Sequence, residues 1–378
     1  MSERIARAAL SRLSEPGDPR LAALVDQLGA TRVYELLCDE EDLTGVRTDV
    51  ATRLRGLDPE RELADAGVRG IRFVCPGDDE WPSWLDDLNR AEPVQRRGGA
   101  PLGLWAKGTL RIRDACRRSV AVVGSRSATT YGAGVAADIA AHVANDGLSV
   151  VSGAAFGIDQ AAHRGALAAK GPTVAVLACG VDRIYPSAHK NLLDYIADVG
   201  LIVSELPPGC SPTRIRFLSR NRLIAALTQG TVVVEAAVRS GALNTANWAT
   251  RLNRVLMGVP GPVTSAPSEG VHELIRARDA ALVTRGADVL ELLAPAGEQL
   301  VEQRRGAERA RDALRSREQQ VLEAVPVIRL VSSESIARTA GLSVAETATT
   351  LVRLKDLGFV EESSGEWRVA PKEDASSA

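Results

Sequence analysis

The chain has 378 residues, of which 45% are hydrophobic and 25% are charged, the balance of a globular protein that can bury a core. The formal net charge of −2 excludes a globally basic nucleic-acid-binding protein, so any attraction to polyanions must come from a local patch. The five cysteines are far apart and form no CxxC pair, which argues against a zinc site and a disulfide framework and favours reduced thiols.

Residues 1–70 alternate apolar and charged residues at helical spacing, with short Gly and Pro breaks. This pattern predicts a small helical bundle. The first residues, "MSERIARAAL", are charged and lack an apolar signal core, and no run of about 18 apolar residues occurs in the chain. We therefore expect a cytoplasmic protein.

Residues 71–118 supply prolines, glycines and three of the five tryptophans, which indicates an irregular connector packed onto a larger domain. From residue 119 to 293, short apolar runs alternate with helical stretches. Continuous apolar strands between helices are typical of a parallel sheet covered on both faces, so we predict a doubly wound α/β domain. The predicted strands lie in "VAVVG", "LSVVSG", "TVAVLACG", "LIVSE", "TVVVEA", "VLMGVPG" and "AALVT".

Residues 296–315 are strongly charged and are predicted to be a linker. Residues 316–372 show helical patterns followed by two short strands around a Ser-Ser-Gly turn, which predicts a winged helix. Its expected recognition helix, "SVAETATTLVRLKDL", carries as many acids as bases. Duplex binding needs a more cationic face, so we interpret this domain as a protein-interaction module rather than the core of a transcription factor.

The first strand of the α/β domain is followed by Gly124-Ser125-Arg126. A glycine turn between a strand and a helix offers N–H groups to an anion, and an arginine fork matches phosphate geometry. The turn is neither GxGxxG nor GxxxxGK[ST], so we expect no dinucleotide or nucleoside triphosphate cofactor. The alternative is a tight turn with a solvated arginine.

The second strand leads into "SGAAFGIDQAAH", where Gly153 permits a close backbone approach. Asp159 and His163 are four residues apart and share a helix face, a spacing that would also suit a general-base pair or two metal ligands. No further ligand stands at helical spacing, and we favour helix capping and a buried Asp–His hydrogen bond, with no metal.

Further cations follow the later strands, and we expect them to meet at the same edge of the sheet, where ligands of such sheets bind. Cations gathered at helix starts favour a phosphate-bearing partner, and Phe217 beside them is suited to stacking a base. Alternatively, the arginines of "FLSRNR" pair with Glu205 and Glu235, two acids that also follow strands. The residues expected to converge are Arg126, Lys190, Arg220, Asn221 and Arg222.

With these motifs, the chain resembles the DNA-processing protein A (DprA, also called Smf) family. The resemblance rests on the strand–GSR turn and on "SGAAFGID", "LACGVDRIYP", "SELPPG", "FLSRNR", "VVVEAAVRSGALNTANWA" and "VPG", in this order over about residues 71–293. It implies an extended Rossmann-like DNA-binding domain over residues 71–295. The helical head, as a domain similar to the SAM or helix-hairpin-helix (HhH) type, and the winged-helix tail also suit the family's longer members.

The resemblance further implies a protein that binds single-stranded DNA, forms a homodimer through the Rossmann-like domain and loads the RecA recombinase during natural transformation. It implies neither enzymatic activity nor a cofactor. The rival interpretation is a nucleotide-processing enzyme of the related Rossmann-like phosphoribohydrolases, but the turn "VEAAVRSGALNTA" lacks their paired glycines and glutamate. Carried over by motif, the phosphate-binding residues are Ser125, Arg126, Gly153, Lys190, Arg220 and Asn221, with Phe217 near a base.

Overall fold

The computed structural model describes residues 1–39, 57–301 and 310–371. The chain divides into two compact units, Met1–Val301 and Glu302–Ala378. The helical residues expected as a separate first domain therefore belong to the same unit as the α/β residues. Of the predicted linker, residues 302–309 lie outside the described residues, and a short 3-10 helix, Ala310–Ala313, follows them.

The described part of the first unit contains one nine-stranded sheet, in the order β1-β2-β6-β5-β4-β3-β7-β8-β9. Strands β3 to β9 are parallel and confirm the seven predicted strands. Their bounds are β3 (Ser119–Val123), β4 (Ser149–Ser152), β5 (Thr173–Val176), β6 (Leu201–Ser204), β7 (Gly230–Val233), β8 (Val255–Gly258) and β9 (Ala281–Leu282).

The prediction of an irregular connector over residues 71–118 is wrong in part. This stretch supplies β1 (Ile71–Val74) and β2 (Leu104–Gly108), which add to the sheet through antiparallel pairing with each other and with β6. Between them lie the 3-10 helix η2 (Ser83–Asp86) and α6 (Asp87–Arg90). The two strands are stabilised by aromatic packing, since the rings of Phe73 and Trp105 lie 4.8 Å apart on paired residues.

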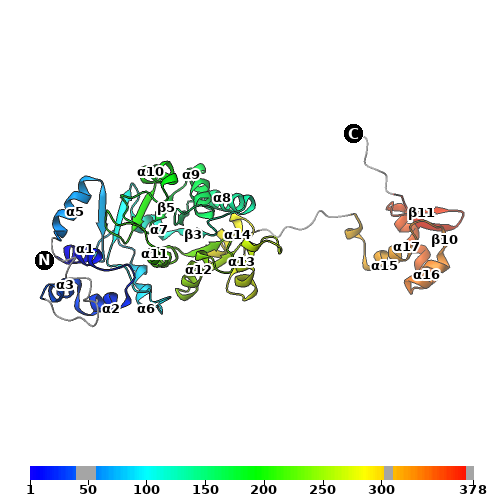
Figure 1. The fold of residues 1–378 in the computed structure, drawn as a ribbon. Helices are drawn as coiled ribbons and strands as arrows, with labels where there is room; N and C mark the ends of the chain where they lie inside the picture. The colour runs from blue at the N-terminus through cyan, green and yellow to red at the C-terminus, as the bar shows by residue number, and fades with distance from the viewer. Residues whose placement is uncertain (40–56, 302–309, 372–378) are drawn as a thin grey trace. The chain divides into compact units, whose positions relative to one another are not determined.

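Helices cover both faces of the sheet, as predicted for a doubly wound fold (Figure 1). Val120 and Val122 pack toward α8 and α9, whereas Ala121 and Val123 pack toward α11 and α12, because successive side chains of a strand point to opposite faces. The helix bounds are α7 (Ile112–Arg117), α8 (Thr130–Asn145), α9 (Ile158–Ala168), α10 (Lys190–Val199), α11 (Arg214–Leu227), α12 (Gly241–Arg251), α13 (Ala266–Arg276) and α14 (Gly286–Leu293).

The N-terminal helices pack against one another, and the last of them packs on β1. They are α1 (Glu3–Leu13), α2 (Pro19–Leu28), α3 (Ala30–Cys38) and α5 (Pro59–Val68). Leu10, Val25 and Val33 are buried among them, which confirms a helical head. The head is tied to the α/β part by a hydrogen bond from Arg4 to the carbonyl of Phe73 at 2.6 Å.

The second unit has the helices and the strand hairpin of a winged helix. It contains α15 (Ser316–Ala324), α16 (Ser333–Ala340), α17 (Val344–Asp356), β10 (Val331–Ser332), β11 (Val360–Ser363) and β12 (Glu366–Val369), with sheet order β10-β12-β11. On α17, Arg353 pairs with Glu318 and Lys355 pairs with Glu362, each at 2.8 Å. Both cations of this helix are thus neutralised within the unit. Across the described ranges, no helix is long and apolar enough to cross a membrane.

Candidate nucleic-acid interface

The sheet changes winding direction between β3 and β7. From β3 the chain continues through β4, β5 and β6 on one side, and from β7 through β8 and β9 on the other. Loops that leave two such strands toward opposite faces open a crevice at their carboxyl ends, where doubly wound proteins bind ligands. A groove of about 930 Å³ lies there, lined by the loop after β3, by α11 and by the start of α12.

The loop after β3 is held rigidly between two neighbouring elements. The N–H of Ser125 donates to the carbonyl of Glu235 at 2.7 Å, and the carbonyl of Ser125 accepts from Ile158 N–H at 3.1 Å. Gly157, with φ 78°, lies so close that a Cβ there would collide with the Ser125 carbonyl. The close backbone packing at Ser125 thus depends on a glycine at the start of α9.

Three exposed arginines line the groove: Arg126 from this loop, Arg214 from the start of α11 and Arg239 from the turn before α12. Within the described residues, none of the three forms an ion pair, and Arg126 lies with its guanidinium 4.7 Å from the centre of the Phe217 ring. Arg214 and Arg239 were missed from the sequence, although Arg239 stands within "VVVEAAVRSGALNTANWA" and Arg214 lies between "SELPPG" and "FLSRNR". Both follow a strand and lie at or just before the start of a helix, and this position was the available signal.

The expected start of the helix around "FLSRNR" is wrong. Helix α11 begins at Arg214, where Thr213 caps it by accepting a hydrogen bond from the N–H of Arg216. Phe217, Arg220 and Asn221 therefore lie inside the helix and not at its exposed N–H groups. Since successive helical residues are turned by about 100°, the three polar residues of "RNR" point in different directions.

Arg222 does not reach the groove. Its side chain is fully buried and donates to both carboxylate oxygens of Glu205, at 2.7 and 2.6 Å, and to the carbonyl of Gly99 at 3.1 Å. The alternative that an arginine of this motif pairs with Glu205 is thereby confirmed for Arg222. Glu235, the other acid of that alternative, instead accepts from the N–H and hydroxyl of Thr129, at 3.0 and 2.5 Å.

Arg220 lies under the floor of the groove. Its Nη1 donates to the carbonyls of Gly153 and Val176, both at 2.7 Å, and a Cβ on Gly153 would collide with this guanidinium. The pKa of Arg220 is lowered to about 10, chiefly by burial and to a smaller degree by Arg126, while Asp159 opposes both effects. A group with this pKa stays charged at neutral pH, so Arg220 contributes a positive charge to the floor, which Asp159 also lines. Gly153 makes room for that charge.

The predicted hydrogen bond between Asp159 and His163 is wrong. Asp159 accepts from the N–H groups of Gly153 and Ala155, at 3.1 and 3.4 Å, whereas His163 Nδ1 bonds the hydroxyl of Thr173 at 2.8 Å. Burial lowers the pKa of His163 to about 3, with smaller contributions from His189 and Arg220. The two side chains have different hydrogen-bond partners and form no acid–base pair.

The remaining two predicted residues differ in their relation to the groove. Asn221 lines it and donates to the carbonyl of Gly241 at 3.2 Å, which joins α11 to the start of α12. Lys190 lies at the start of α10, outside the groove lining, and pairs with Asp194 one turn further along the helix. The structure thus brings Ser125, Arg126, Phe217, Arg220 and Asn221 together, with Gly153 beneath them, and leaves out Lys190 and Arg222.

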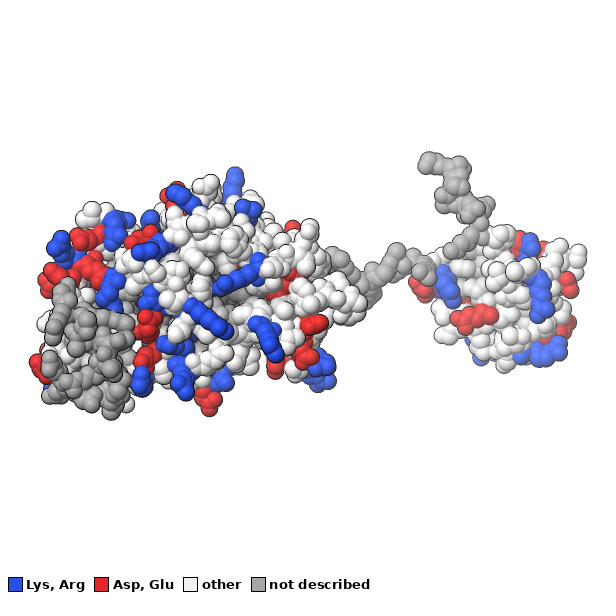
Figure 2. Space-filling view, in the orientation of Figure 1, with Lys and Arg blue, Asp and Glu red and all other residues white. Residues whose placement is uncertain are grey.

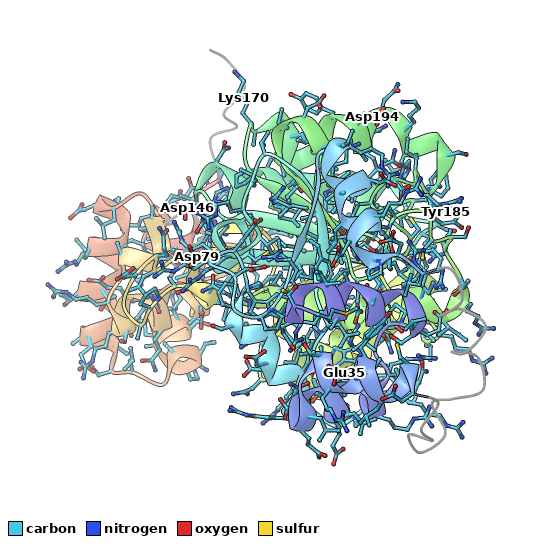
Figure 3. All side chains as sticks on the ribbon, turned by 90° about the vertical axis from the view of Figure 1, so that its left-hand side faces the viewer. Glu35, Asp79, Asp146, Lys170, Tyr185 and Asp194 are labelled. Carbon is cyan, nitrogen blue, oxygen red and sulfur yellow. The ribbon has the colours of Figure 1, made fainter. Side chains whose placement is uncertain are left out.

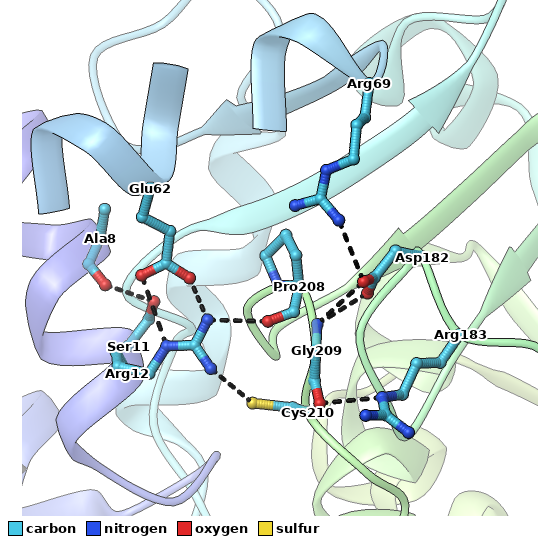
Figure 4. A network of polar contacts seen from close by, with 10 residues as sticks. All are labelled: Ala8, Ser11, Arg12, Glu62, Arg69, Asp182, Arg183, Pro208, Gly209 and Cys210. Atoms are coloured by element: carbon cyan, nitrogen blue, oxygen red, sulfur yellow. Dashed lines mark hydrogen bonds and ion pairs between the residues drawn. The ribbon is translucent and has the colours of Figure 1, made fainter. Parts of the chain in front are cut away.

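The helical head anchors the loop that leads to residues 212 and 213 (Figure 4). Arg12 of α1 pairs with Glu62 of α5 and donates to the carbonyl of Pro208 at 2.7 Å and to Cys210 Sγ at 3.3 Å. The same loop is held on its other side by Arg183, which donates to the carbonyl of Gly209 at 2.8 Å. Residues 212 and 213, which line the groove, directly follow this anchored segment.

The surface around the groove is locally cationic in spite of the neutral overall balance. Figure 2 shows Lys and Arg side chains spread over the middle of this unit, in the region where Figure 1 labels β3, α11 and α12, with few acidic side chains among them. Acidic side chains are more frequent toward the ends of the unit. A local field of this kind attracts a polyanion without a large net charge on the whole chain.

The chain is similar to known proteins in both sequence and fold. The family model for DNA recombination-mediator protein A matches residues 72–294. The chain is 44% identical over 377 residues to a putative DNA processing protein DprA from Mycobacterium tuberculosis, covering 96% of this chain and 93% of the relative.

Two solved structures share the fold. The structure of DNA processing protein A from Streptococcus pneumoniae is 34% identical, with a TM-score of 0.62, and the match covers 77% of this chain and 97% of that one. A structure that concerns the single-stranded DNA binding mode of DNA processing protein A from Helicobacter pylori is 28% identical, with a TM-score of 0.50, covering 58% and 95%.

Proposed function

Because this chain belongs to the DNA recombination-mediator protein A family, we propose that it binds single-stranded DNA in the groove between the ends of β3 and β7. The observation that carries the proposal is the set of three exposed arginines without an acidic partner in the described part of the chain: Arg126, Arg214 and Arg239. Unpaired guanidinium groups along one groove match a run of phosphates.

Each groove residue has a distinct role in this proposal. Arg126 and the hydroxyl of Ser125 contact phosphates directly, and Arg220 adds its buried charge beneath them. Asn221 and Gly153 position other parts of the groove: Asn221 joins α11 to α12, and Gly153 leaves space for the Arg220 side chain. Contacts to phosphates carry no base information, so binding is largely independent of sequence.

In the wider proposal, a homodimer formed through the Rossmann-like domain presents two grooves to one strand, and the protein loads the RecA recombinase in DNA uptake and recombination in the cytoplasm. Support for the dimer comes from the sheet edge, where Leu282 of β9 is 54% exposed. Two linked grooves raise the effective concentration for the second contact. The mass of the protein in solution tests the dimer, and RecA filament assembly on single strands tests loading.

The second candidate function is nucleotide processing, because a groove at this position also suits a nucleoside monophosphate. Against it stands Glu235, the acid that ends the β7 motif: it is 2% exposed and bonded to Thr129 through both carboxylate oxygens. A carboxylate occupied in this way is not available to a substrate. We therefore propose binding without catalysis as the function of the groove.

The test is fluorescence anisotropy with labelled oligo-dT and a duplex of equal length, over a salt series. Wild type is expected to prefer the single strand. In R126A the affinity falls, and the slope of log K against log salt is reduced by about 0.7 for each phosphate that the variant no longer neutralises.

The matched control is R117A, which removes an exposed arginine at the end of α7, beside the opposite edge of the sheet. It is expected to bind like wild type. Equal or stronger duplex binding that ignores Arg126 would assign the activity to the winged helix. No binding, together with turnover of a nucleoside monophosphate followed by chromatography, would establish the enzyme instead.

A further inference from the structure

Aromatic rings gather beside the groove, although they make up only 3% of the chain. Tyr185, Phe156 and Phe217 all line a second, smaller pocket next to it. Tyr185 is 43% exposed and Phe156 is 47% exposed, so neither ring is used by the core. Exposed apolar side chains that lie together in one patch commonly mark a binding site.

The smaller pocket continues the groove. Arg126, Tyr185 and Phe217 line both of them, so a ligand that leaves the groove past Arg126 meets these rings next. The rings of Tyr185 and Phe217 lie 5.6 Å apart and are tilted by 52°. Figure 3 shows Tyr185 on the opposite side of the α/β part from Asp146, the C-cap residue of α8, which places the ring at the carboxyl edge of the strands.

Phe156 is exposed but well supported. Its ring packs edge-on against the imidazole of His189, with 4.6 Å between the ring centres. His189 is itself buried and its Nδ1 bonds the carbonyl of Ala154 at 2.9 Å. A ring fixed in this way loses little conformational freedom when a ligand stacks on it, so its exposed face is preorganised for binding.

We propose that Tyr185 and Phe156 form a second base-stacking site beyond Phe217, so that each subunit holds successive bases of a single strand as well as its phosphates. This inference rests on the proposed function. The rings of Tyr185 and Phe217 form a tilted contact pair 5.6 Å apart, so no base fits between them and a base stacks on an exposed ring face.

The size of the pocket defines how a base is bound. Its volume of about 40 Å³ admits only a few water molecules, since one water needs roughly 10–15 Å³ on the same measure. A base therefore lies on the exposed ring faces and is not enclosed. Stacking on a ring face is tolerant of sequence, because every base offers a π-face.

The experiment compares Y185A, F156A and Y185F for binding to oligo-dT and to an abasic oligonucleotide with the same number of phosphates. Y185A and F156A are each expected to lower the affinity for oligo-dT by roughly 5- to 100-fold, the range for removal of a base–aromatic stack. Y185F keeps the ring and is expected to bind like wild type. The control is Y195A, which removes a tyrosine on α10 that is 53% exposed.

On the abasic oligonucleotide, Y185A, F156A and wild type are expected to bind equally, with unchanged salt slopes, because every phosphate keeps its cationic partner. Equally weakened binding of both oligonucleotides would mean that the substitutions distort the groove, and would overturn the stacking site. Wild-type affinity of both alanine variants for oligo-dT would also overturn it while leaving single-strand binding intact. If wild type itself binds neither oligonucleotide, the proposed function fails first.

Discussion

The replacement of Arg222 by methionine tests whether this residue stabilises the protein interior or binds DNA. Arg222 is fully buried and makes two hydrogen bonds to Glu205, one to the carbonyl of Gly99 and one to that of Ser219 at 2.9 Å. R222M leaves the Glu205 carboxylate buried without a counter-charge. Breaking a buried pair in this way costs about 3–5 kcal/mol of unfolding free energy, a large part of the roughly 5–15 kcal/mol of a typical domain.

A second variant tests whether the cost comes from the stranded charge. In E205M/R222M both charges are gone, and two apolar side chains of similar length fill the space. Replacement of a whole buried pair is close to neutral or stabilising in other proteins, so the double variant should be more stable than R222M. The exposed control is R276A, whose pair with Glu273 is 77% and 60% exposed and is expected to contribute almost nothing.

The assay is urea unfolding followed by tryptophan fluorescence, because four of the five tryptophans lie in Met1–Val301. Anisotropy with oligo-dT is measured in parallel, at urea concentrations where each variant remains folded. We expect R222M to lose stability and keep its affinity for single strands. A variant as stable as wild type that no longer binds the strand would refute the interior role and return Arg222 to the groove.

Two further substitutions probe the loop after β3 and the buried histidine. G157A should push the Ser125 carbonyl away and weaken single-strand binding about tenfold or more. The control G134A, with nothing within 4 Å of its Cβ, should bind the strand like wild type and be slightly more stable. Equal affinities of the two variants in anisotropy would contradict this prediction. Burial lowers the pKa of His163 to about 3, so below pH 6.5 the unfolded chain takes up a proton that the folded chain does not. Between pH 7.5 and 5.5, the unfolding free energy of wild type measured in urea should therefore fall by about 1 kcal/mol more than that of H163N. H142N is the control for an exposed histidine. Equal decreases in the unfolding free energy of wild type and H163N would rule this out.

The strands of the parallel sheet could be predicted because their signal is local. Each consists of a short apolar run that must be covered on both faces, and such runs are distinct from the amphipathic helices between them. The strand–turn–helix at Gly124-Ser125-Arg126 could be predicted for the same reason, and with it the location of the groove at the carboxyl edge of the sheet. The strands β1 and β2 escaped prediction, because their pairing partners are each other and β6, which lie far away in the sequence.

The position of each arginine around the groove depended on contacts that no short stretch of sequence contains. The start of α11 is defined by the Thr213 cap, and this start turns Arg222 toward Glu205 and Gly99, 17 and 123 residues away, while Arg220 turns toward the groove floor. In the sequence, an arginine that will lie at the surface cannot be distinguished from one that will form a buried ion pair. The sequence by itself therefore determined that cations gather near this edge of a doubly wound sheet. Only the tertiary structure decided which of them meet an acid and which have no acidic partner among the described residues, because that depends on side chains brought together by folding.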